Sequence, residues 1–269
     1  YDDAIKRQRA TSPVKEAHRS YLAWLRLQQD PKQRRAPGAT CMSALQSGRM
    51  GTIKKRINNS KGCGGVMRTA PVGLAFPTGE LAFRYGAEFA AITHGHPSGY
   101  LSAGFLSELI FHLAHGTDLQ DAILRCRTTL ISSPEHEETL ARIDRALKLA
   151  PGSMTTASAI ESIGGGWTGE EALAISLLCA LRFQHSFIRG VLAAVNHSGD
   201  SDSTGSITGS ILGTLLGITS IPKNWVEILE NSKHIEICAM DLYKTFVYQV
   251  YKAGEPDSPP GLEYSSPVP

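Results

Sequence analysis

Apolar residues recur at intervals of three and four positions along most of the chain, which is the spacing of one face of an α-helix. In the segment SPVKEAHRSYLAWLRLQQ, Val14, Ala17 and Tyr21 follow this spacing. A serine and a proline precede them, and these residue types suit the cap and the first turn of a helix. The pattern therefore predicts a helix near the start of the chain.

The same spacing predicts six further helices, and several of these segments end in glycine, which is typical of helix C-termini. No two runs of alternating apolar and polar residues are joined by a hairpin turn, so little β-sheet is expected. We predict an all-α fold of roughly ten helices of ordinary length. The six segments are residues 79–95, 99–116, 118–131, 134–150, 168–184 and 232–253.

The domain organisation follows from the absence of any linker or fixed-period repeat within the helical pattern. We predict one compact helical domain over residues 1–252. The remaining residues, 253–269, hold five of the chain's 14 prolines. Because proline cannot continue a helix, this tail is expected to be an extended strap or disordered.

The composition narrows the functional class. The chain has 269 residues, 42% of them hydrophobic, and a formal net charge of +2. This content is enough for a sizeable core, and the near-balanced charge argues against a nucleic-acid-binding protein. The five cysteines form no CxxC pair, so their spacing suggests neither a disulfide framework nor a zinc site. We expect a cytoplasmic protein with no membrane segment and no signal peptide.

The segment NHSGDSDSTGSITG, residues 196–209, gathers oxygen-bearing side chains directly before a glycine-rich helix. Asp200, Asp202 and Ser203 fall at the first, third and fourth positions of a turn, where their oxygens can converge. Carboxylate and hydroxyl oxygens are the ligands that a hard divalent cation prefers. A helix cap formed by Asp202 or Ser203 is the alternative, but one capping residue is enough for that purpose. We therefore predict a cation site.

This site is not a calcium loop of the EF-hand type, because Ile211 occupies the twelfth position, where a bidentate Glu is required. One cluster also supplies too few ligands, so other oxygens are expected from elsewhere in the fold. The helix that follows carries four glycines on one ridge, at positions 205, 209, 213 and 217. Because such a ridge allows another helix to approach closely, we predict a buried central helix that fixes the acidic segment.

Three other stretches interrupt the helical pattern and are expected to be functional loops. They are residues 34–45, 58–74 and 161–173. In the second, Gly64 and Gly65 let backbone amides approach an anionic ligand closely. Arg68 beside them is interpreted either as part of such an anion site or as a surface or ion-paired side chain.

Single residues in these regions have competing interpretations. Cys63 could act as a nucleophile with His94 or His96, but a lone cysteine among glycines is more often inert. The two histidines lie at a helix end, where C-terminal capping explains them. Trp167 follows three glycines. It is either an exposed aromatic that stacks on a base or a core anchor.

Five stretches taken in order resemble the ADP-ribosylglycohydrolase family, which includes dinitrogenase reductase-activating glycohydrolase and the crystallin J1-like proteins. They are APGATC, SKGCGGVMRTAPVGL, THGHP, GGGWTGEEALAISL and NHSGDSDSTGSITGSILG, and they span most of residues 35–217. The resemblance implies a compact orthogonal multi-helix domain. The last stretch is similar to the family's D-x-D-[ST] signature. By this resemblance Asp200, Asp202 and Ser203 bind two Mg²⁺ or Mn²⁺ ions together with other ligands.

The resemblance also implies a substrate pocket and an activity. Gly64, Gly65, Met67, His94 and Trp167 are expected to line a pocket for ADP-ribose. The implied reaction is hydrolysis of the N- or O-glycosidic bond between ADP-ribose and an acceptor, often an arginine side chain. The expected partners are ADP-ribosylated protein or ADP-ribose and, for a role in immunity, an ADP-ribosyltransferase toxin.

One part of the family pattern is missing. The family's N-terminal T-D-D-T-x-M motif supplies further metal ligands, and Tyr1–Ala4 has neither its threonines nor its methionine. We therefore expect the catalytic residue and the other ligands upstream of Tyr1, rather than at Asp2 and Asp3. Two alternatives to an enzyme follow. One is a non-catalytic relative that binds ADP-ribosylated protein or blocks a transferase, and the other is a crystallin-like structural protein.

Overall fold

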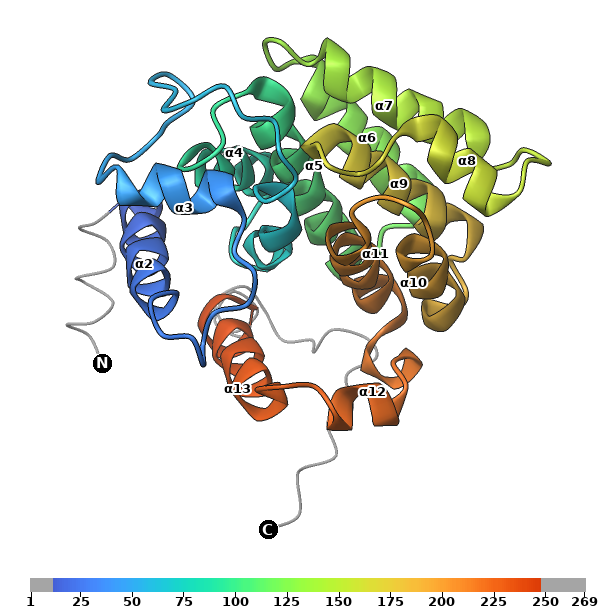
Figure 1. The fold of residues 1–269 in the computed structure, drawn as a ribbon. Helices are drawn as coiled ribbons and strands as arrows, with labels where there is room; N and C mark the ends of the chain where they lie inside the picture. The colour runs from blue at the N-terminus through green and yellow to red at the C-terminus, as the bar shows by residue number, and fades with distance from the viewer. Residues whose placement is uncertain (1–11, 248–269) are drawn as a thin grey trace.

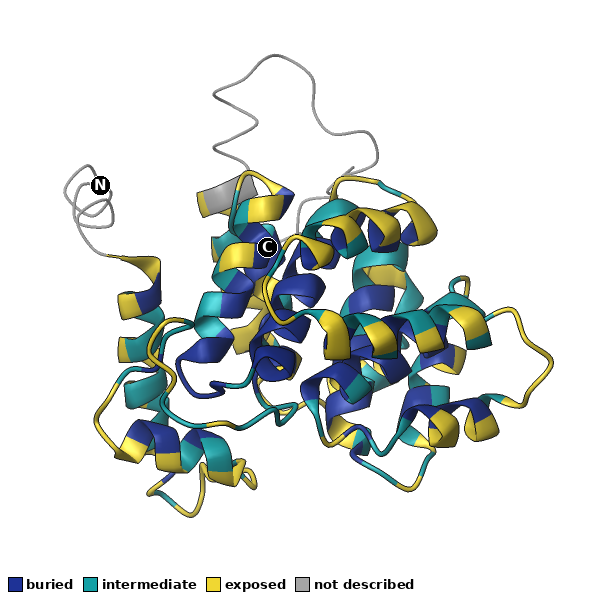
Figure 2. Ribbon diagram, turned by 90° about the horizontal axis from the view of Figure 1, so that it is seen from above, coloured by how far each residue is buried: buried dark blue, intermediate teal, exposed yellow. Residues whose placement is uncertain are grey.

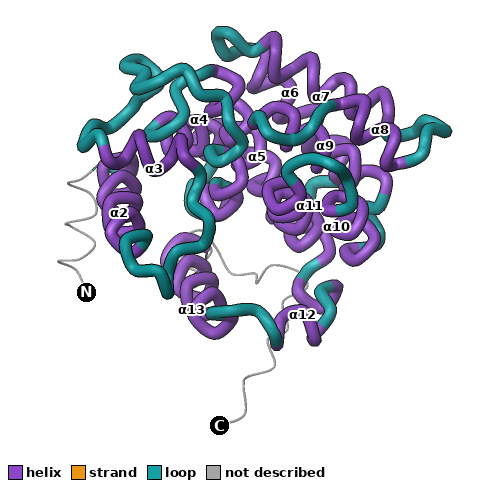
Figure 3. Tube along the Cα trace, viewed as in Figure 1, coloured by secondary structure: helices purple, strands orange, loops and turns teal. Residues whose placement is uncertain are grey.

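The fold is all-α, as predicted. A computed structural model describes residues 12–247, within which the chain forms twelve α-helices and no strand (Figures 1 and 3). The α-helices are α2 (Pro13–Leu27), α3 (Ala39–Gln46), α4 (Gly79–Ala91), α5 (Pro97–Ala114), α6 (Leu119–Ile131), α7 (Glu137–Leu149), α8 (Thr156–Ile163), α9 (Gly169–Arg182), α10 (Phe187–Val195), α11 (Ser201–Leu216), α12 (Lys223–Glu227) and α13 (Ser232–Leu242). Short helical turns are η1 (Val66–Arg68), η2 (Ala70–Leu74), η3 (Ile218–Ser220) and η4 (Tyr243–Val247).

Side-chain caps define where several helices begin. Thr78 accepts a hydrogen bond from the Leu81 amide and starts α4, and Asp118 accepts one from the Gln120 amide at the start of α6. His96 caps α5, because its Nδ1 accepts a hydrogen bond from the Ser98 amide at 3.1 Å. The expected role of His96 at a helix C-terminus was therefore wrong, since this histidine begins the next helix.

The predicted long helices are present, but residues 34–45 are not only a loop. Helix α3 begins at Ala39 and buries Cys41, Ala44 and Leu45. With eight residues it is too short to show the periodicity that identified the longer helices. The predicted loop is therefore confirmed only for residues 34–38.

Helix α5 is the centre of the molecule. It packs against α4, α6, α9 and α11, and 15 of its 18 residues are buried. In Figure 2 the inner helices are largely buried, whereas the outer ones expose one face. The predicted central helix, α11, buries mainly one side, with Ser206 exposed on the other. Small residues in α5 allow its neighbours to pack closely around it. Gly104, for example, lies close to the Phe83 carbonyl of α4.

The glycine ridge of α11 faces α10, but close approach is needed at one glycine only. A Cβ on Gly205 would lie 2.6 Å from Val195, whereas Cβ atoms on Gly209 and Gly213 would make ordinary contacts with Phe187 at 3.9 and 3.8 Å. Gly217 ends the helix with φ of +77°. The tight contact therefore lies in the first turns of α11.

Some sequence predictions fall outside the described residues. These are the proline-rich tail, the end of the predicted 1–252 domain, and Asp2 and Asp3. Among the helices of residues 12–247, none is long and apolar enough to cross a membrane.

The contact between α4 and α5 gives a stability prediction. In Gly86→Ala, the new Cβ would meet the Ala103 carbonyl oxygen at 2.8 Å and Ser107 Cβ at 2.7 Å. We expect the free energy of unfolding to fall by about 1–3 kcal/mol, measured by urea denaturation. The matched control is Gly209→Ala, also within a helix. It should raise stability by up to about 1 kcal/mol, because alanine is the better helix former. Equal stability of the two variants would contradict the tight packing.

Candidate functional site

Three segments that are far apart in the sequence meet at the N-terminus of α11. We call them the glycine loop (residues 60–65), the tryptophan loop (residues 164–168) and the acidic cluster (Asp200, Asp202 and Ser203). The Asp200 amide donates a hydrogen bond to the Gly165 carbonyl at 2.8 Å, and the Cys63 amide donates one to the Trp167 carbonyl at 3.1 Å. An isolated bridge between Gly62 and Thr168 adds a second link between the two loops. The structure therefore brings together the three segments that the sequence singled out.

Glycine is required where the tryptophan loop touches the acidic segment. A Cβ on Gly199 would lie 1.9 Å from the Gly165 carbonyl oxygen, so any side chain there would separate the two backbones. Gly166 has φ of +76°, in the left-handed region that favours glycine. The close contact at Gly199 and the left-handed backbone at Gly166 explain why glycine occupies these two positions beside the site.

Asp200 is the N-cap of α11, and it is also the buried member of the acidic cluster. Its Oδ1 accepts a hydrogen bond from the Ser203 amide at 3.5 Å, and the Cys63 thiol donates to Oδ2 at 2.7 Å. Asp202 is exposed, whereas Ser203 is buried and donates to Met67 Sδ at 3.3 Å. The alternative of a cap formed by Asp202 or Ser203 was wrong, since the cap is one residue outside the helix, at Asp200.

The two carboxyl groups of the cluster interact directly. A hydrogen bond to Asp200 raises the pKa of Asp202, and burial adds to this shift. Burial also raises the pKa of Asp200, but hydrogen bonds from Asp202, Cys63 and Ser203 outweigh it, so the net pKa is lowered. Two carboxylates this close repel each other when both are ionised. A divalent cation between them removes that repulsion, so the donor chemistry fits a hard cation.

The cluster is an incomplete ligand set on its own. Asp200, Asp202 and Ser203 offer two carboxylates and one hydroxyl, whereas Mg²⁺ takes about six oxygen ligands and commonly keeps several waters. Among residues 12–247 no third His, Cys, Asp or Glu has a ligand atom within 4.8 Å of those of both Asp200 and Asp202. The residues that are present fit one side of a cation site.

Cys63 lies against the acidic cluster as a thiol and not as a thiolate. Burial, followed by the hydrogen bond to Asp200, raises its pKa to about 12. Since the thiolate is the nucleophilic form, the geometry argues against the nucleophile interpretation of Cys63. Its observed role is to hold Asp200.

His94 lies beneath the glycine loop. Its side chain is 1% exposed, and a Cβ on Gly64 would sit 3.3 Å from its ring. Its Nδ1 shares a hydrogen bond with the Thr93 hydroxyl at 2.8 Å. Burial, with Arg68 adding to it, lowers the pKa of His94 to about 3, so the imidazole is neutral. His94 supports Gly64 and Gly65 from behind, and Gly65 in turn packs against the Gly99 carbonyl of α5.

Arg68 is committed to internal contacts, so neither interpretation from the sequence describes it. It donates to the Thr93 hydroxyl at 2.7 Å and to Cys41 Sγ at 3.2 Å, and it lies over the Tyr21 ring at 4.4 Å. It ties the helical turn after the glycine loop to α2, α3 and α4.

Met67 and Trp167 are the exposed side chains at the rim of the site. Trp167 is 63% exposed, which excludes the core-anchor interpretation, and Met67 is 37% exposed. Trp167 belongs to the loop that accepts the Asp200 amide, and its ring lies next to Gly165 of that loop, where a Cβ would be 2.7 Å from it. An exposed indole in such a place is suited to stacking.

Sequence reasoning missed Glu171. Its Oε2 accepts a hydrogen bond from the Gly166 amide at 3.2 Å, and Arg142 lies 3.7 Å from its Oε1. A glutamate in the first turn of a helix, close after a glycine loop, often reaches back to an amide at the helix start, and that signal was available.

Comparisons with known proteins agree with the fold and identify the family. A family model described as ADP-ribosylglycohydrolase matches residues 3–250. ADP-ribosylhydrolase ARH3 of Homo sapiens is 24% identical over 216 residues, which cover 70% of this chain and 59% of that protein. The Bos taurus ADP-ribosylhydrolase ARH3 is 22% identical over 215 residues, covering 70% and 58%. The chain thus spans less than two thirds of the length of these curated relatives.

A solved structure shares the fold. A chain of an ADP-ribosylglycohydrolase-related protein complex superposes with a TM-score of 0.66 at 24% sequence identity, covering 89% of this chain and 76% of that chain. The family match extends over nearly the whole sequence, including the acidic cluster and both loops. This chain belongs to the ADP-ribosylglycohydrolase family.

Proposed function

We propose that this chain carries the ADP-ribose pocket and one side of the metal site of a hydrolase that releases ADP-ribose from modified protein side chains, with ADP-ribosyl-arginine as the substrate. The observation that carries the proposal is the assembly of the acidic cluster, the glycine loop and the tryptophan loop around the N-terminus of one helix. Family membership and the relatives named ADP-ribosylhydrolase support the reaction class.

In this proposal the acidic cluster holds Mg²⁺ or Mn²⁺, with two ions in the complete enzyme. A divalent cation supplies Lewis-acid polarisation and holds the ribose hydroxyls in a fixed orientation. Asp200 is oriented for this role by Cys63 and the Ser203 amide, while Asp202 faces solvent, where the substrate arrives. No residue among those described is assigned to the proton transfer that glycoside hydrolysis also needs.

The remaining residues position the nucleotide. The backbone of Gly64 and Gly65 can approach a diphosphate closely, because neither residue carries a side chain. Trp167 offers an exposed ring on which the adenine stacks. Met67 bridges the two regions, since it follows the glycine loop and accepts the Ser203 hydroxyl. We place the protein in the cytoplasm. Its partner there would be an ADP-ribosylated protein or, for a role in immunity, an ADP-ribosyltransferase toxin.

One observation favours a second function. The acidic cluster supplies three side-chain ligands at this site, and the Cys63 thiol donates a hydrogen bond to Asp200 Oδ2. A chain with that ligand set suits a non-catalytic relative that binds ADP-ribosylated protein or blocks an ADP-ribosyltransferase, as in immunity to a toxin. Release of ADP-ribose separates the two functions, because both bind ADP-ribose and only the enzyme liberates it.

Loss of Asp202 tests the hydrolase proposal. In the full-length protein, with Mg²⁺ and ADP-ribosyl-arginine, Asp202→Ala is expected to lower ADP-ribose release at least about 100-fold, equivalent to about 2.7 kcal/mol in the transition state, because the cation loses a carboxylate ligand. An O-linked ADP-ribosyl-serine substrate tested in parallel identifies the acceptor. The matched control is Asp121→Asn, an exposed acid on α6, which should keep full activity. Equal release from Asp202→Ala and the unchanged protein rules the proposal out.

Calorimetric titration with Mg²⁺ tests how many ligands the chain supplies. For residues 1–269 we expect weak binding or one site, because three side chains make up the acidic cluster and Mg²⁺ favours six oxygens. Asp202→Ala should weaken that binding further. Two tight Mg²⁺ sites on this chain would show that the missing ligands lie within it.

Trp167 gives a binding prediction. In Trp167→Ala, affinity for ADP-ribose in calorimetry should fall by about 5–150-fold, the equivalent of about 1–3 kcal/mol for one base stacked on an aromatic ring. The melting temperature should not change, because the side chain is 63% exposed. Trp167→Phe should retain much of the affinity. An unchanged affinity in Trp167→Ala would exclude stacking on this ring.

A further inference from the structure

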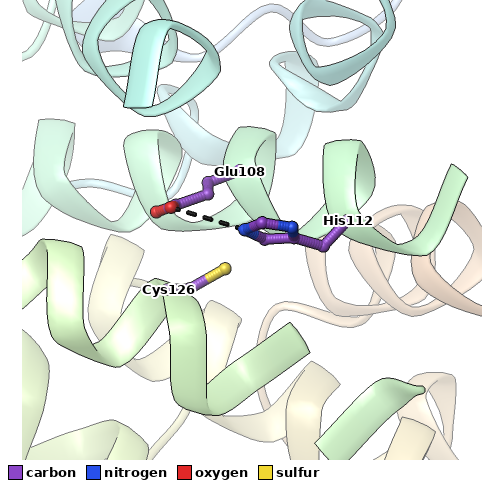
Figure 4. Close-up of side chains that lie close together, drawn as sticks. All are labelled: Glu108, His112 and Cys126. Atoms are coloured by element: carbon purple, nitrogen blue, oxygen red, sulfur yellow. Dashed lines mark ion pairs between the residues drawn. The ribbon is translucent and has the colours of Figure 1, made fainter. Parts of the chain in front are cut away.

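A second cluster of ligand-type side chains lies outside the proposed site, between α5 and α6. Glu108 and His112 are one helical turn apart on α5, and Cys126 faces them from α6 (Figure 4). A carboxylate oxygen, an imidazole nitrogen and the sulfur all lie within 4.8 Å of one another. No sequence motif marks this group, because Cys126 has no cysteine or histidine at a metal-binding spacing and comes from a separate helix.

One atom of this cluster lacks a partner. Glu108 is 2% exposed, and its Oε1 accepts a hydrogen bond from the Thr129 hydroxyl at 2.7 Å. Its Oε2 is buried without any hydrogen-bond partner among the described residues. A buried carboxyl oxygen left in this state costs free energy, so a native protein seldom keeps one without a ligand or another use for it.

The three groups have the ligand chemistry of zinc. Zn²⁺ binds cysteine sulfur, histidine nitrogen and carboxylate oxygen in a tetrahedral arrangement. Glu108 Oε1 and His112 Nε2 are 3.6 Å apart. Two ligands at about 2.0–2.1 Å from a tetrahedral Zn²⁺ are separated by about 3.4 Å, so these two atoms already stand at the distance that a shared ion requires. A tetrahedral Zn²⁺ places sulfur about 3.5 Å from the other two ligand atoms, so the sulfur would need to move inward by no more than about 1.3 Å.

The charges also balance. One thiolate, one carboxylate and one neutral imidazole carry two negative charges, which a divalent cation cancels, so no net charge is buried. Binding releases the thiol proton, and the carboxyl proton where present, to solvent, with no change of oxidation state.

The N-terminus of α4 packs against the cluster. Gly79 is its first residue, and a Cβ there would lie 3.1 Å from His112 Nε2 and 3.3 Å from Glu108 Oε1. His112 is partly exposed, which gives a cation a route from solvent. Ser98 lies in the first turn of α5, near the glycine loop. Glu108 follows it by ten residues, which is about 15 Å of helix. This cluster is therefore distinct from the acidic cluster.

We propose that Glu108, His112 and Cys126 form a zinc site that joins α5 to α6, with water as the fourth ligand. Zinc fits better than magnesium, because a hard cation does not select sulfur. The site lies on the helix around which the molecule is built. It is independent of the proposed hydrolase function.

The test is metal binding to the whole chain after treatment with a chelator. We expect one Zn²⁺ per chain by calorimetry, and Co²⁺ in its place should give the near-ultraviolet absorption of a thiolate-bound metal. Cys126→Ser should abolish that absorption and weaken Zn²⁺ binding on the order of 100-fold, and Glu108→Gln should weaken it at least about 10-fold. The melting temperature of the unchanged protein should rise with Zn²⁺.

Two controls separate this site from other ligands. Cys238→Ser disrupts the exposed pair in which Cys238 Sγ lies 3.7 Å from His234 Nε2. Asp202→Ala removes one carboxylate of the acidic cluster. Both should retain the thiolate absorption. The proposal fails if the unchanged protein shows no thiolate-to-Co²⁺ absorption, or if that absorption disappears in Cys238→Ser. The measurement on the unchanged protein decides the matter even where Cys126→Ser does not fold.

Discussion

The backbone contact between the tryptophan loop and the acidic segment is the constraint on which the site depends. The Gly165 carbonyl accepts the Asp200 amide at 2.8 Å, and this contact exists because Gly199 has no side chain. It fixes the residue that both caps α11 and carries the buried carboxylate. The same loop presents Trp167 and links to the glycine loop through Cys63. Three segments are thereby held together by main-chain hydrogen bonds.

The helices beneath give this assembly a rigid base. Buried α5 contacts the glycine loop through Gly99 and also packs against α11. Its residues Ser98 and Ser102 lie against Gly169, the first residue of α9, directly after the tryptophan loop. The neutral His94 fills the space behind the glycine loop without introducing a buried charge. Rigid helices that carry functional loops at their ends are a common arrangement in enzymes and in binding proteins. The fold alone therefore does not separate hydrolysis from binding.

The fold class and the long helices could be predicted from the sequence, because their apolar spacing runs over several turns. Short helices such as α3, with eight residues, could not, since two turns carry little periodic signal. The acidic cluster was found from its residue types alone. The burial of His94, the thiol contact of Cys63 and the meeting of Cys126 with Glu108 and His112 all depend on packing between distant segments. No local spacing encodes such contacts, so single-sequence reasoning misses them.

The central claim is that a divalent cation binds at the acidic cluster. Anomalous diffraction from crystals soaked in Mn²⁺ tests it most directly, because the signal locates the metal itself. We expect an anomalous peak within ligand distance of the Asp200 and Asp202 carboxylates. The peak should be absent from crystals of Asp202→Ala. Crystals of the unchanged protein, saturated with Mn²⁺ and ADP-ribose, that show no peak at these two carboxylates would contradict the claim.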